Sequence, residues 1–171
     1  MASRLGEGTR VSVYLPLHEG QASAESKSVA PEGGHGERVL FVDDEEAIGQ
    51  VCGRLLTRSG YQVVVCMSPV EALARFSSAP SDFDLVITDL TMPRMNGNQL
   101  ALAVLALRPN IPVLMVTGNS AGLTRQSVRH LGVFDLLQKP ITRQALTTAV
   151  RQALDSVTPR RGDVDPKGTL F

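Results

Sequence analysis

Residues 38–46 read RVLFVDDEE, in which four large apolar side chains are followed directly by four acidic ones. A short, uninterrupted apolar run is typical of a strand that is buried on both faces, as in a parallel sheet covered by helices. The acidic residues then stand at the carboxyl end of that strand, where ligands bind in sheets of this kind. The stretch therefore predicts an α/β domain with polar chemistry at one edge of its sheet.

The same alternation of strand-like and helix-like patterns continues through residues 38–156. The strand-like runs are rich in Val, Ile and Leu: VLFV (39–42), VVVC (63–66), LVIT (85–88), PVLMV (112–116) and FDLLQ (134–138). Helical patterns follow them over residues 45–58, from 69 onward, and over 98–107, 123–131 and 142–155. Five such βα units predict an α/β fold, a doubly wound five-stranded parallel sheet with right-handed crossovers and helices on both faces.

For two of the predicted helices the sequence also indicates the role of individual residues. The first has five apolar residues on one stripe that should face the core, namely Ile48, Val51, Cys52, Leu55 and Leu56. The second begins SPVE (68–71), where Ser68 is the expected N-cap and Glu71 the expected partner in a capping box.

The bulk composition fits one soluble domain with extensions. The chain has 171 residues, 43% of them apolar, and its 17 basic residues balance its 17 acidic residues. Without net charge there is no global field to attract nucleic acid or an anionic membrane, so neither is expected as a partner. Cys52 and Cys66 lie in apolar patterns without CxxC spacing and are expected to be reduced core residues. No run is apolar enough for a membrane span or a signal peptide, which predicts a cytoplasmic location.

Two segments outside the α/β pattern have the composition of flexible chain. Residues 18–37 hold a single aliphatic side chain larger than alanine among Gly, Ser, Glu and Pro, which predicts a flexible linker. Residues 157–171, with two prolines and two glycines, are expected to form a disordered tail. The tail is too short for a helix-turn-helix, which disfavours a DNA-binding regulator.

Polar residues end four of the five predicted strands. Asp43 and Asp44 follow the first strand, Asp89 ends the third, Thr117 the fourth, and Lys139 follows the fifth. Each has an ordinary interpretation by itself, since an Asp pair ahead of a helix commonly serves as an N-cap and a lysine is commonly solvated. Their coincidence at one edge of the sheet indicates a functional site.

The chemistry expected of this site is phosphoryl transfer. Three carboxylates at one edge repel each other, and Mg²⁺ is the expected remedy because it takes oxygen ligands and is often shared between carboxylates and phosphate oxygens. Lys139 would supply a point charge and Thr117 a hydroxyl donor for phosphoryl oxygens. Asp89 is the expected nucleophile, because it ends the central strand of the series, between the other groups.

Four segments, in their order and spacing, resemble the receiver domain of two-component response regulators: FVDDEE (41–46), DLVITDLTMPRMNG (84–97), PVLMVTG (112–118) and LLQKPI (136–141). The resemblance covers residues 38–156 and implies a flavodoxin-like receiver fold with strand order 2-1-3-4-5. It also implies that Asp89 accepts a phosphoryl group from a phosphohistidine of a histidine kinase or a histidine phosphotransfer protein.

The resemblance further implies a role for each residue of the site. Asp44 would bind Mg²⁺ directly and Asp43 chiefly through water, while Asp89 and the backbone carbonyl of Thr91 would complete the protein ligands. Thr117 and Lys139 would contact the phosphoryl group. The Lys139–Pro140 peptide bond would be cis, as in the family.

One position departs from the family pattern. Three residues before the lysine the family usually has Tyr or Phe, whose ring turns inward on phosphorylation, and this chain has Leu136. The nearest aromatic residue is Phe134, which the two-residue period of a strand places on the same face as Leu136. The usual aromatic switch is therefore in doubt, and signalling through the Thr117 loop alone or simple phosphate relay are both open.

Residues 3–17, SRLGEGTRVSVYLPL, resemble the end of the ATP-binding domain of a histidine kinase. A lone glycine turn is a weak motif, and a plain hairpin or strand is the alternative. Next to a linker and a receiver domain, residues 1–17 are expected to be a remnant of a kinase domain, which makes this chain the C-terminal end of a hybrid sensor histidine kinase. Residues 10–17 should then be disordered or pair with an edge strand of another molecule.

Two other functions stay open. A stand-alone single-domain response regulator would share the chemistry and differ in its biology. A Mg²⁺-dependent phosphatase for small molecules is a remote alternative, because such enzymes generally carry a second acidic residue two positions after the nucleophile, where this chain has Thr91. The chain alone is expected to catalyse only its own aspartyl phosphorylation and dephosphorylation.

Overall fold

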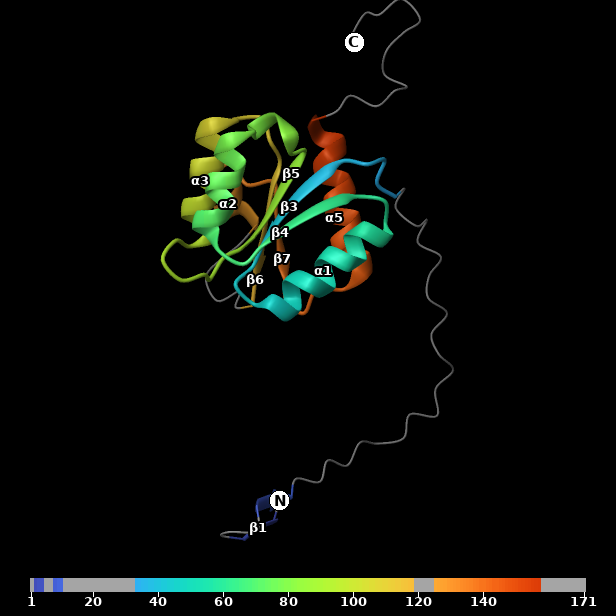
Figure 1. Cartoon of the computed structure of the whole chain (residues 1–171), viewed down its shortest axis with the longest axis vertical. Helices are drawn as coiled ribbons and strands as arrows, with labels where there is room; N and C mark the ends of the chain where they lie inside the picture. The colour runs from blue at the N-terminus through green and yellow to red at the C-terminus, as the bar shows by residue number, and fades with distance from the viewer. Residues whose placement is uncertain (1, 5–7, 11–32, 119–124, 158–171) are drawn as a thin grey trace, which may run out of the picture. The chain divides into compact units, whose positions relative to one another are not determined.

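A computed structural model of the chain describes residues 2–4, 8–10, 33–118 and 125–157, which belong to two separate units (Figure 1). In the first unit, β1 (Ala2–Arg4) and β2 (Gly8–Arg10) form an antiparallel pair with Ser3 opposite Thr9. The predicted strand beyond Arg10, the linker up to residue 32 and the tail from residue 158 lie outside the described residues.

The second unit contains the predicted five-stranded parallel sheet. Its strands, in spatial order, are β4 (Gln62–Cys66), β3 (Arg38–Val42), β5 (Leu85–Asp89), β6 (Val113–Thr117) and β7 (Asp135–Gln138). Numbered within the unit, this is the order 2-1-3-4-5. The fold class and the strand order expected from the sequence are therefore confirmed, and β5 is the central strand.

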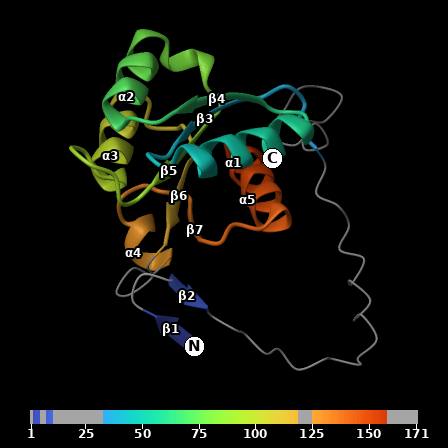
Figure 2. The same ribbon diagram turned by 60° about the horizontal axis from the view of Figure 1, so that its bottom comes forward.

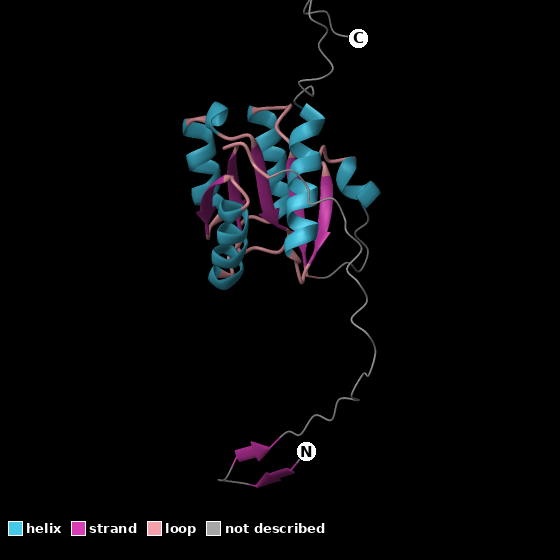
Figure 3. Cartoon of the chain, turned by 90° about the vertical axis from the view of Figure 1, so that its right-hand side faces the viewer, coloured by secondary structure: helices cyan, strands magenta, loops and turns pink. Residues whose placement is uncertain are grey.

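Helices cover both faces of the sheet (Figures 2 and 3). They are α1 (Glu46–Arg58), α2 (Pro69–Ser78), α3 (Gly97–Leu107), α4 (Arg125–Arg129) and α5 (Arg143–Val157), with a 3-10 turn, η1, at Pro80–Asp82. Because side chains alternate along a strand, Leu40 and Val42 pack into one core with α2, α3 and α4, while Val39 and Phe41 pack into another with α1 and α5. The sheet is thus buried on both faces, as its apolar runs predict.

Two details of the predicted helices are wrong. Ser68 is the N-cap of α2, but its side chain makes no capping hydrogen bond, and Glu71 instead pairs with Arg75 at 2.9 Å. Within α1 the predicted stripe includes Val51, whose side chain is 52% exposed. The residues that face the sheet there include Gly49 and Gly53, where an added Cβ would lie 3.0 and 2.9 Å from the Val65 side chain.

The residues just ahead of β3 are held against the folded unit. The amides of Gly34 and Gly36 donate to the carbonyls of Ser59 and Gly60, at 2.6 and 3.1 Å. The carboxylate of Glu37 accepts from Arg151 of α5 at 2.6 Å. Composition alone assigns residues 33–37 to the linker, but these contacts attach them to the turn after α1 and to α5.

Both cysteines are buried and free, as expected. Among the described residues, none of the helices has the length and apolar character needed to cross a membrane.

Candidate functional site

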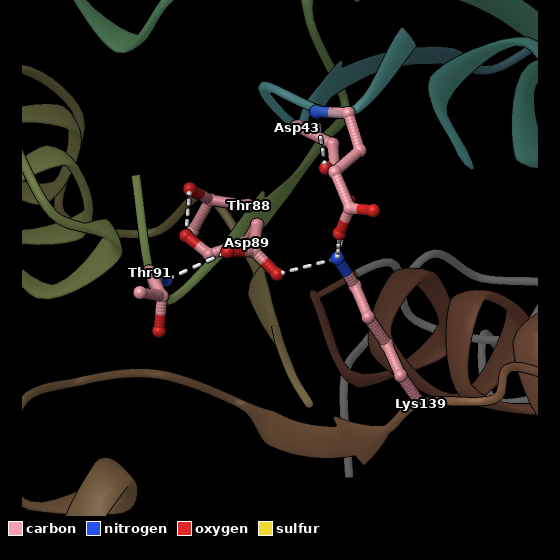
Figure 4. Close-up of polar contacts among 6 residues, drawn as sticks. Asp43, Thr88, Asp89, Thr91 and Lys139 are labelled. Atoms are coloured by element: carbon pink, nitrogen blue, oxygen red, sulfur yellow. Dashed lines mark hydrogen bonds and ion pairs between the residues drawn. The ribbon is translucent and has the colours of Figure 1, made fainter. Parts of the chain in front are cut away.

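The register of the sheet brings the predicted site residues to one edge. Val42 is aligned with Thr88 and Val116 with Asp89. Asp43 therefore follows β3 at the level of Asp89 on β5, and Thr117 stands one residue further along β6. Figure 4 shows Asp43, Asp89 and Lys139, which come from three different strand ends and converge on one point.

Asp89 is held in place through both of its carboxylate oxygens. Its side chain is 4% exposed. Oδ2 accepts a hydrogen bond from the backbone N–H of Thr91 at 2.6 Å, and Oδ1 lies 2.9 Å from Nζ of Lys139. Next to it, the hydroxyl of Thr88 donates to the Asp89 carbonyl at 3.0 Å. The carboxylate is thus almost buried yet neutralised by a neighbouring cation.

Asp43 is fully buried at the start of the turn into α1. Its Oδ1 accepts from the backbone N–H of Glu45 at 2.9 Å, which orients the carboxylate. Oδ2 forms an ion pair with Nζ of Lys139 at 3.0 Å. Among the described residues, Lys139 is the one partner of this buried oxygen, which as a carboxylate oxygen can also accept a further cation.

Lys139 is the cation that the carboxylates of the site share. It follows β7, and its backbone N–H donates to the carbonyl of Thr117 at 2.8 Å. Its ammonium group lies within 3.1 Å of the carboxylates of Asp43, Glu45 and Asp89. Burial alone would lower the pKa of Lys139, but the three carboxylates together raise that pKa above its ordinary value. The Lys139–Pro140 peptide bond is cis, as expected.

The other predicted residues lie around this centre. Thr117 is buried at the end of β6, and Thr91 follows Asp89 on the loop to α3. Asp44, the next residue after Asp43, is exposed. Within the described ranges, no three acidic, His or Cys side chains form a group able to hold a metal ion by themselves. Lys139 takes the position between Asp43 and Asp89 where a cation would be shared.

The donor set nevertheless fits Mg²⁺. The buried Asp43 Oδ2 has a cation, Lys139, as its one partner in the described part of the chain, and carboxylate oxygens are the ligands that Mg²⁺ prefers. Asp44 and the carbonyl of Thr91 adjoin the same edge and would supply further oxygens. Mg²⁺ also keeps several water ligands, so it does not need a closed protein cage.

The β5–α3 loop passes very close to Asp89. An added Cβ on Gly97 would overlap the Asp89 carbonyl oxygen and lie 2.9 Å from Leu90 Cα. Directly before it, Asn96 caps α3, and its side chain and that of Gln99 form a capping box at 2.9 and 3.0 Å. The cap and the glycine together fix the loop that carries Thr91.

The prediction that Phe134 shares a face with Leu136 is wrong. β7 begins at Asp135, so Phe134 precedes the strand and does not follow its alternation. Phe134 packs against the core on the α1 and α5 side, whereas Leu136 packs against the core on the α2, α3 and α4 side. Phe134 therefore does not take the place of the aromatic residue that the family usually has at position 136.

The charge balance of the site predicts that Asp43→Asn stabilises the protein without Mg²⁺. Burial is the main reason that the pKa of Asp43 is raised. A carboxyl group with a raised folded-state pKa stabilises the fold when protonated, and this contribution is lost as the pH rises through that pKa. At pH 7 the charged form of Asp43 is therefore unfavourable in the folded protein. Asn at this position should raise the free energy of unfolding by about 1 kcal/mol, because Lys139 still has ion pairs with the other two carboxylates.

Denaturant titrations in EDTA measure the difference in the free energy of unfolding between Asp43→Asn and the wild type. It should shrink as the pH falls through the raised pKa of Asp43, because the wild-type side chain then becomes neutral as well. The exposed Asp44→Asn is the matched control and should change stability little. A less stable Asp43→Asn variant at pH 7 would contradict this account of the site.

The fold and site together define a doubly wound α/β domain with an acidic pocket at the carboxyl ends of its strands and one lysine reaching into it. The chain belongs to the response regulator receiver domain family, whose model matches residues 39–151. It is thus a receiver domain of two-component signalling.

Named relatives include regulators as well as kinases. The transcriptional regulatory protein GlrR of Escherichia coli K12 is 34% identical over 121 residues, which cover 71% of this chain and 27% of GlrR. The sensor kinase CckA of Brucella abortus is 28% identical over 162 residues, which cover 90% of this chain and 17% of CckA. The chain therefore spans only a small part of these relatives.

Solved structures agree with the fold. A response regulator receiver domain protein from Clostridium thermocellum superposes with a TM-score of 0.67 at 30% identity, over 70% of this chain and 95% of that one. The receiver domain from the hybrid histidine kinase CckA gives a TM-score of 0.57 at 32% identity, over 68% of this chain and 98% of that one.

Proposed function

We propose that Asp89 is the phosphoacceptor of a two-component phosphorelay and takes a phosphoryl group from a phosphohistidine in a Mg²⁺-dependent reaction. One observation carries the proposal: a single carboxylate, 4% exposed, is oriented by the Thr91 amide and neutralised by Lys139 at the central strand end. Phosphoryl transfer depends mainly on positioning and on charge neutralisation, and this arrangement supplies both.

The transfer follows from these contacts. An Asp89 oxygen attacks the phosphorus while the phosphorus–nitrogen bond breaks, and the imidazole of the donor leaves and takes up a proton. The ammonium of Lys139, which already touches Asp89 Oδ1, then binds an oxygen of the phosphoryl group. Thr117, which ends the neighbouring strand, would donate its hydroxyl to another phosphoryl oxygen.

Mg²⁺ would be held by Asp43, Asp44, Asp89 and the carbonyl of Thr91. When bound, it supplies positive charge to the phosphoryl oxygens. The chain's own contribution is to hold these oxygens at one edge of a rigid sheet, with Lys139 as a second source of positive charge.

The experiment is an intact-mass measurement on the whole chain. With Mg²⁺ and acetyl phosphate, a small phosphodonor, the protein should gain the mass of one phosphoryl group. The adduct should be absent when EDTA replaces Mg²⁺ and when the donor is omitted. A folded protein that gains no mass with Mg²⁺ and donor would overturn the proposal.

We further infer that the chain is the C-terminal end of a hybrid histidine kinase. The alignment with CckA covers 90% of the chain, so it has to extend ahead of Arg38, because residues 38–171 make up less than four-fifths of it. Independently of that alignment, residues 3–17 resemble the end of a kinase ATP-binding domain. The donor would be a histidine kinase or a histidine phosphotransfer protein.

The genomic sequence upstream of Met1 tests this origin. An open frame that continues upstream and encodes a kinase core supports it. A stop codon directly upstream would instead favour a stand-alone response regulator with the same chemistry.

A further inference from the structure

Glu45 makes a contact with the site that its position at a helix start does not require. It is the N-cap residue of α1, and its carbonyl accepts from the amides of Ile48 and Gly49, both at 3.0 Å. Its own amide donates to Asp43 Oδ1 at 2.9 Å. The backbone of Glu45 is therefore fixed by α1 on one side and by the buried carboxylate on the other.

The side chain of Glu45 is not used for capping. It makes no hydrogen bond to the first turn of α1. Instead, Oε1 accepts from Nζ of Lys139 at 3.1 Å, across 94 positions of sequence. An N-cap side chain normally accepts a hydrogen bond from a free amide of its own helix. The Glu45 carboxylate instead accepts from Lys139.

Glu45 differs from the other two carboxylates on Lys139 in its exposure. Asp43 and Asp89 are 0% and 4% exposed, while the Glu45 side chain is 64% exposed. The contact therefore lies on the solvent side of Lys139, which is also the side from which a phosphodonor has to approach the buried Asp89. A carboxylate there repels an incoming phosphoryl group and holds the ammonium that should receive it.

We propose that Glu45 is a positioning residue that competes with the phosphoryl group for the ammonium of Lys139 and so slows phosphorylation of Asp89. The inference rests on the proposed function of Asp89. When the phosphoryl group arrives, Lys139 has to exchange carboxylate contacts for phosphoryl oxygens. Loss of the Glu45 contact lowers the cost of that exchange.

Glu45→Gln tests the competition, with Glu46→Gln as its control. Glu46 is the next residue, is equally acidic and exposed, and pairs with Gln50 at 2.8 Å. At a Mg²⁺ concentration that saturates each variant, Glu45→Gln should gain the phosphoryl mass from acetyl phosphate about two to five times faster than wild type, the effect of one partly exposed ion pair. Glu46→Gln should react at the wild-type rate.

A third variant separates the contact from the general field of the charge. Glu45→Asp keeps the negative charge but is one methylene too short to keep the same approach to Lys139. If the contact matters, Glu45→Asp should react faster than wild type, as Glu45→Gln does. If it reacts at the wild-type rate, the charge acts only through its field and the competition is overturned.

A spectroscopic measurement checks the contact without any phosphoryl chemistry. In the absence of Mg²⁺ and donor, the ammonium ¹⁵N NMR signal of Lys139 should shift in Glu45→Gln and stay in place in Glu46→Gln. An unchanged signal in Glu45→Gln would overturn the inference.

The outcomes distinguish the two proposals. If wild type gains no phosphoryl mass, the proposed function fails and this inference fails with it. If wild type reacts and Glu45→Gln is no faster than Glu46→Gln, only the role of Glu45 is overturned.

Discussion

Lys139→Met should lower the rate of Asp89 phosphorylation from acetyl phosphate by about 100-fold, the usual cost of removing one preorganised group that stabilises developing charge. The ammonium lies 2.9 Å from Asp89 Oδ1 and is the positive group nearest to the acceptor among the described contacts. Methionine has a similar length but no charge. The intact-mass time course with saturating Mg²⁺ measures the rate, and circular dichroism with Mg²⁺ checks that the variant is folded.

Arg58→Met is the matched control for Lys139→Met. Arg58 is an exposed residue at the end of α1, and its loss changes the net charge of the protein by the same amount. It should leave the phosphorylation rate unchanged. A folded Lys139→Met variant that reacts as fast as Arg58→Met would mean that Lys139 neutralises Asp43 and Asp89 in the resting site and takes no part in transfer.

Gly97→Ala should have the largest effect on stability, a loss of about 3 kcal/mol, at the upper end of the range typical of overpacking. The atoms that an added Cβ would meet are backbone atoms of Asp89 and Leu90, which no side-chain rotation moves away. The amide of Gly97 also donates to the Leu90 carbonyl at 2.9 Å, so the whole β5–α3 loop would have to shift. Because this loop carries Thr91, phosphorylation should fall together with stability.

Gly118→Ala is the control for this substitution. An added Cβ at Gly118 would meet no atom within 4 Å. Its effect on the free energy of unfolding, measured by urea titration, should be within about 0.5 kcal/mol, as for most exposed substitutions. If Gly97→Ala were as mild as Gly118→Ala, the loop would not be packed against Asp89 as described.

The fold was predictable because the strands are buried on both faces and are therefore continuous apolar runs, such as VLFV at 39–42 and LVIT at 85–88. The site residues were predictable for a related reason, since the carboxyl ends of parallel strands share one edge. Asp43, Asp89 and Lys139 meet at that edge as expected. The exposure of Asp44 depends on the turn into α1, which strand patterns do not describe.

The errors come from local alternatives that a pattern of apolar residues does not rank. Glu71 was expected in a capping box, but Arg75, one turn later, offers it an ion pair. Asn96 and Gln99 show a similar sequence pattern and do form a capping box, so the pattern alone does not decide which of the two helix starts is capped. On α1, an apolar count favoured Val51, although two glycines let the other face approach β4.

The contact of Glu45 with Lys139 had no sequence feature to predict it. The two residues are 94 positions apart, and the sequence around Glu45 indicates only an ordinary helix start. Only the fold brings them together, because Glu45 follows β3, Lys139 follows β7, and the two parallel strands end at the same edge of the sheet. Phe134 illustrates the same limit, since its face depends on β7 beginning one residue later than the apolar run.

The most direct test of the central claim is to locate the phosphoryl group. The chain is phosphorylated with acetyl phosphate and Mg²⁺ and then treated with borohydride, which reduces an aspartyl phosphate to homoserine, and its peptides are identified by mass spectrometry. The account predicts homoserine at position 89 and nowhere else, and none in Asp89→Asn. Homoserine at position 43 or 44 instead, with Asp89 unchanged, would contradict it.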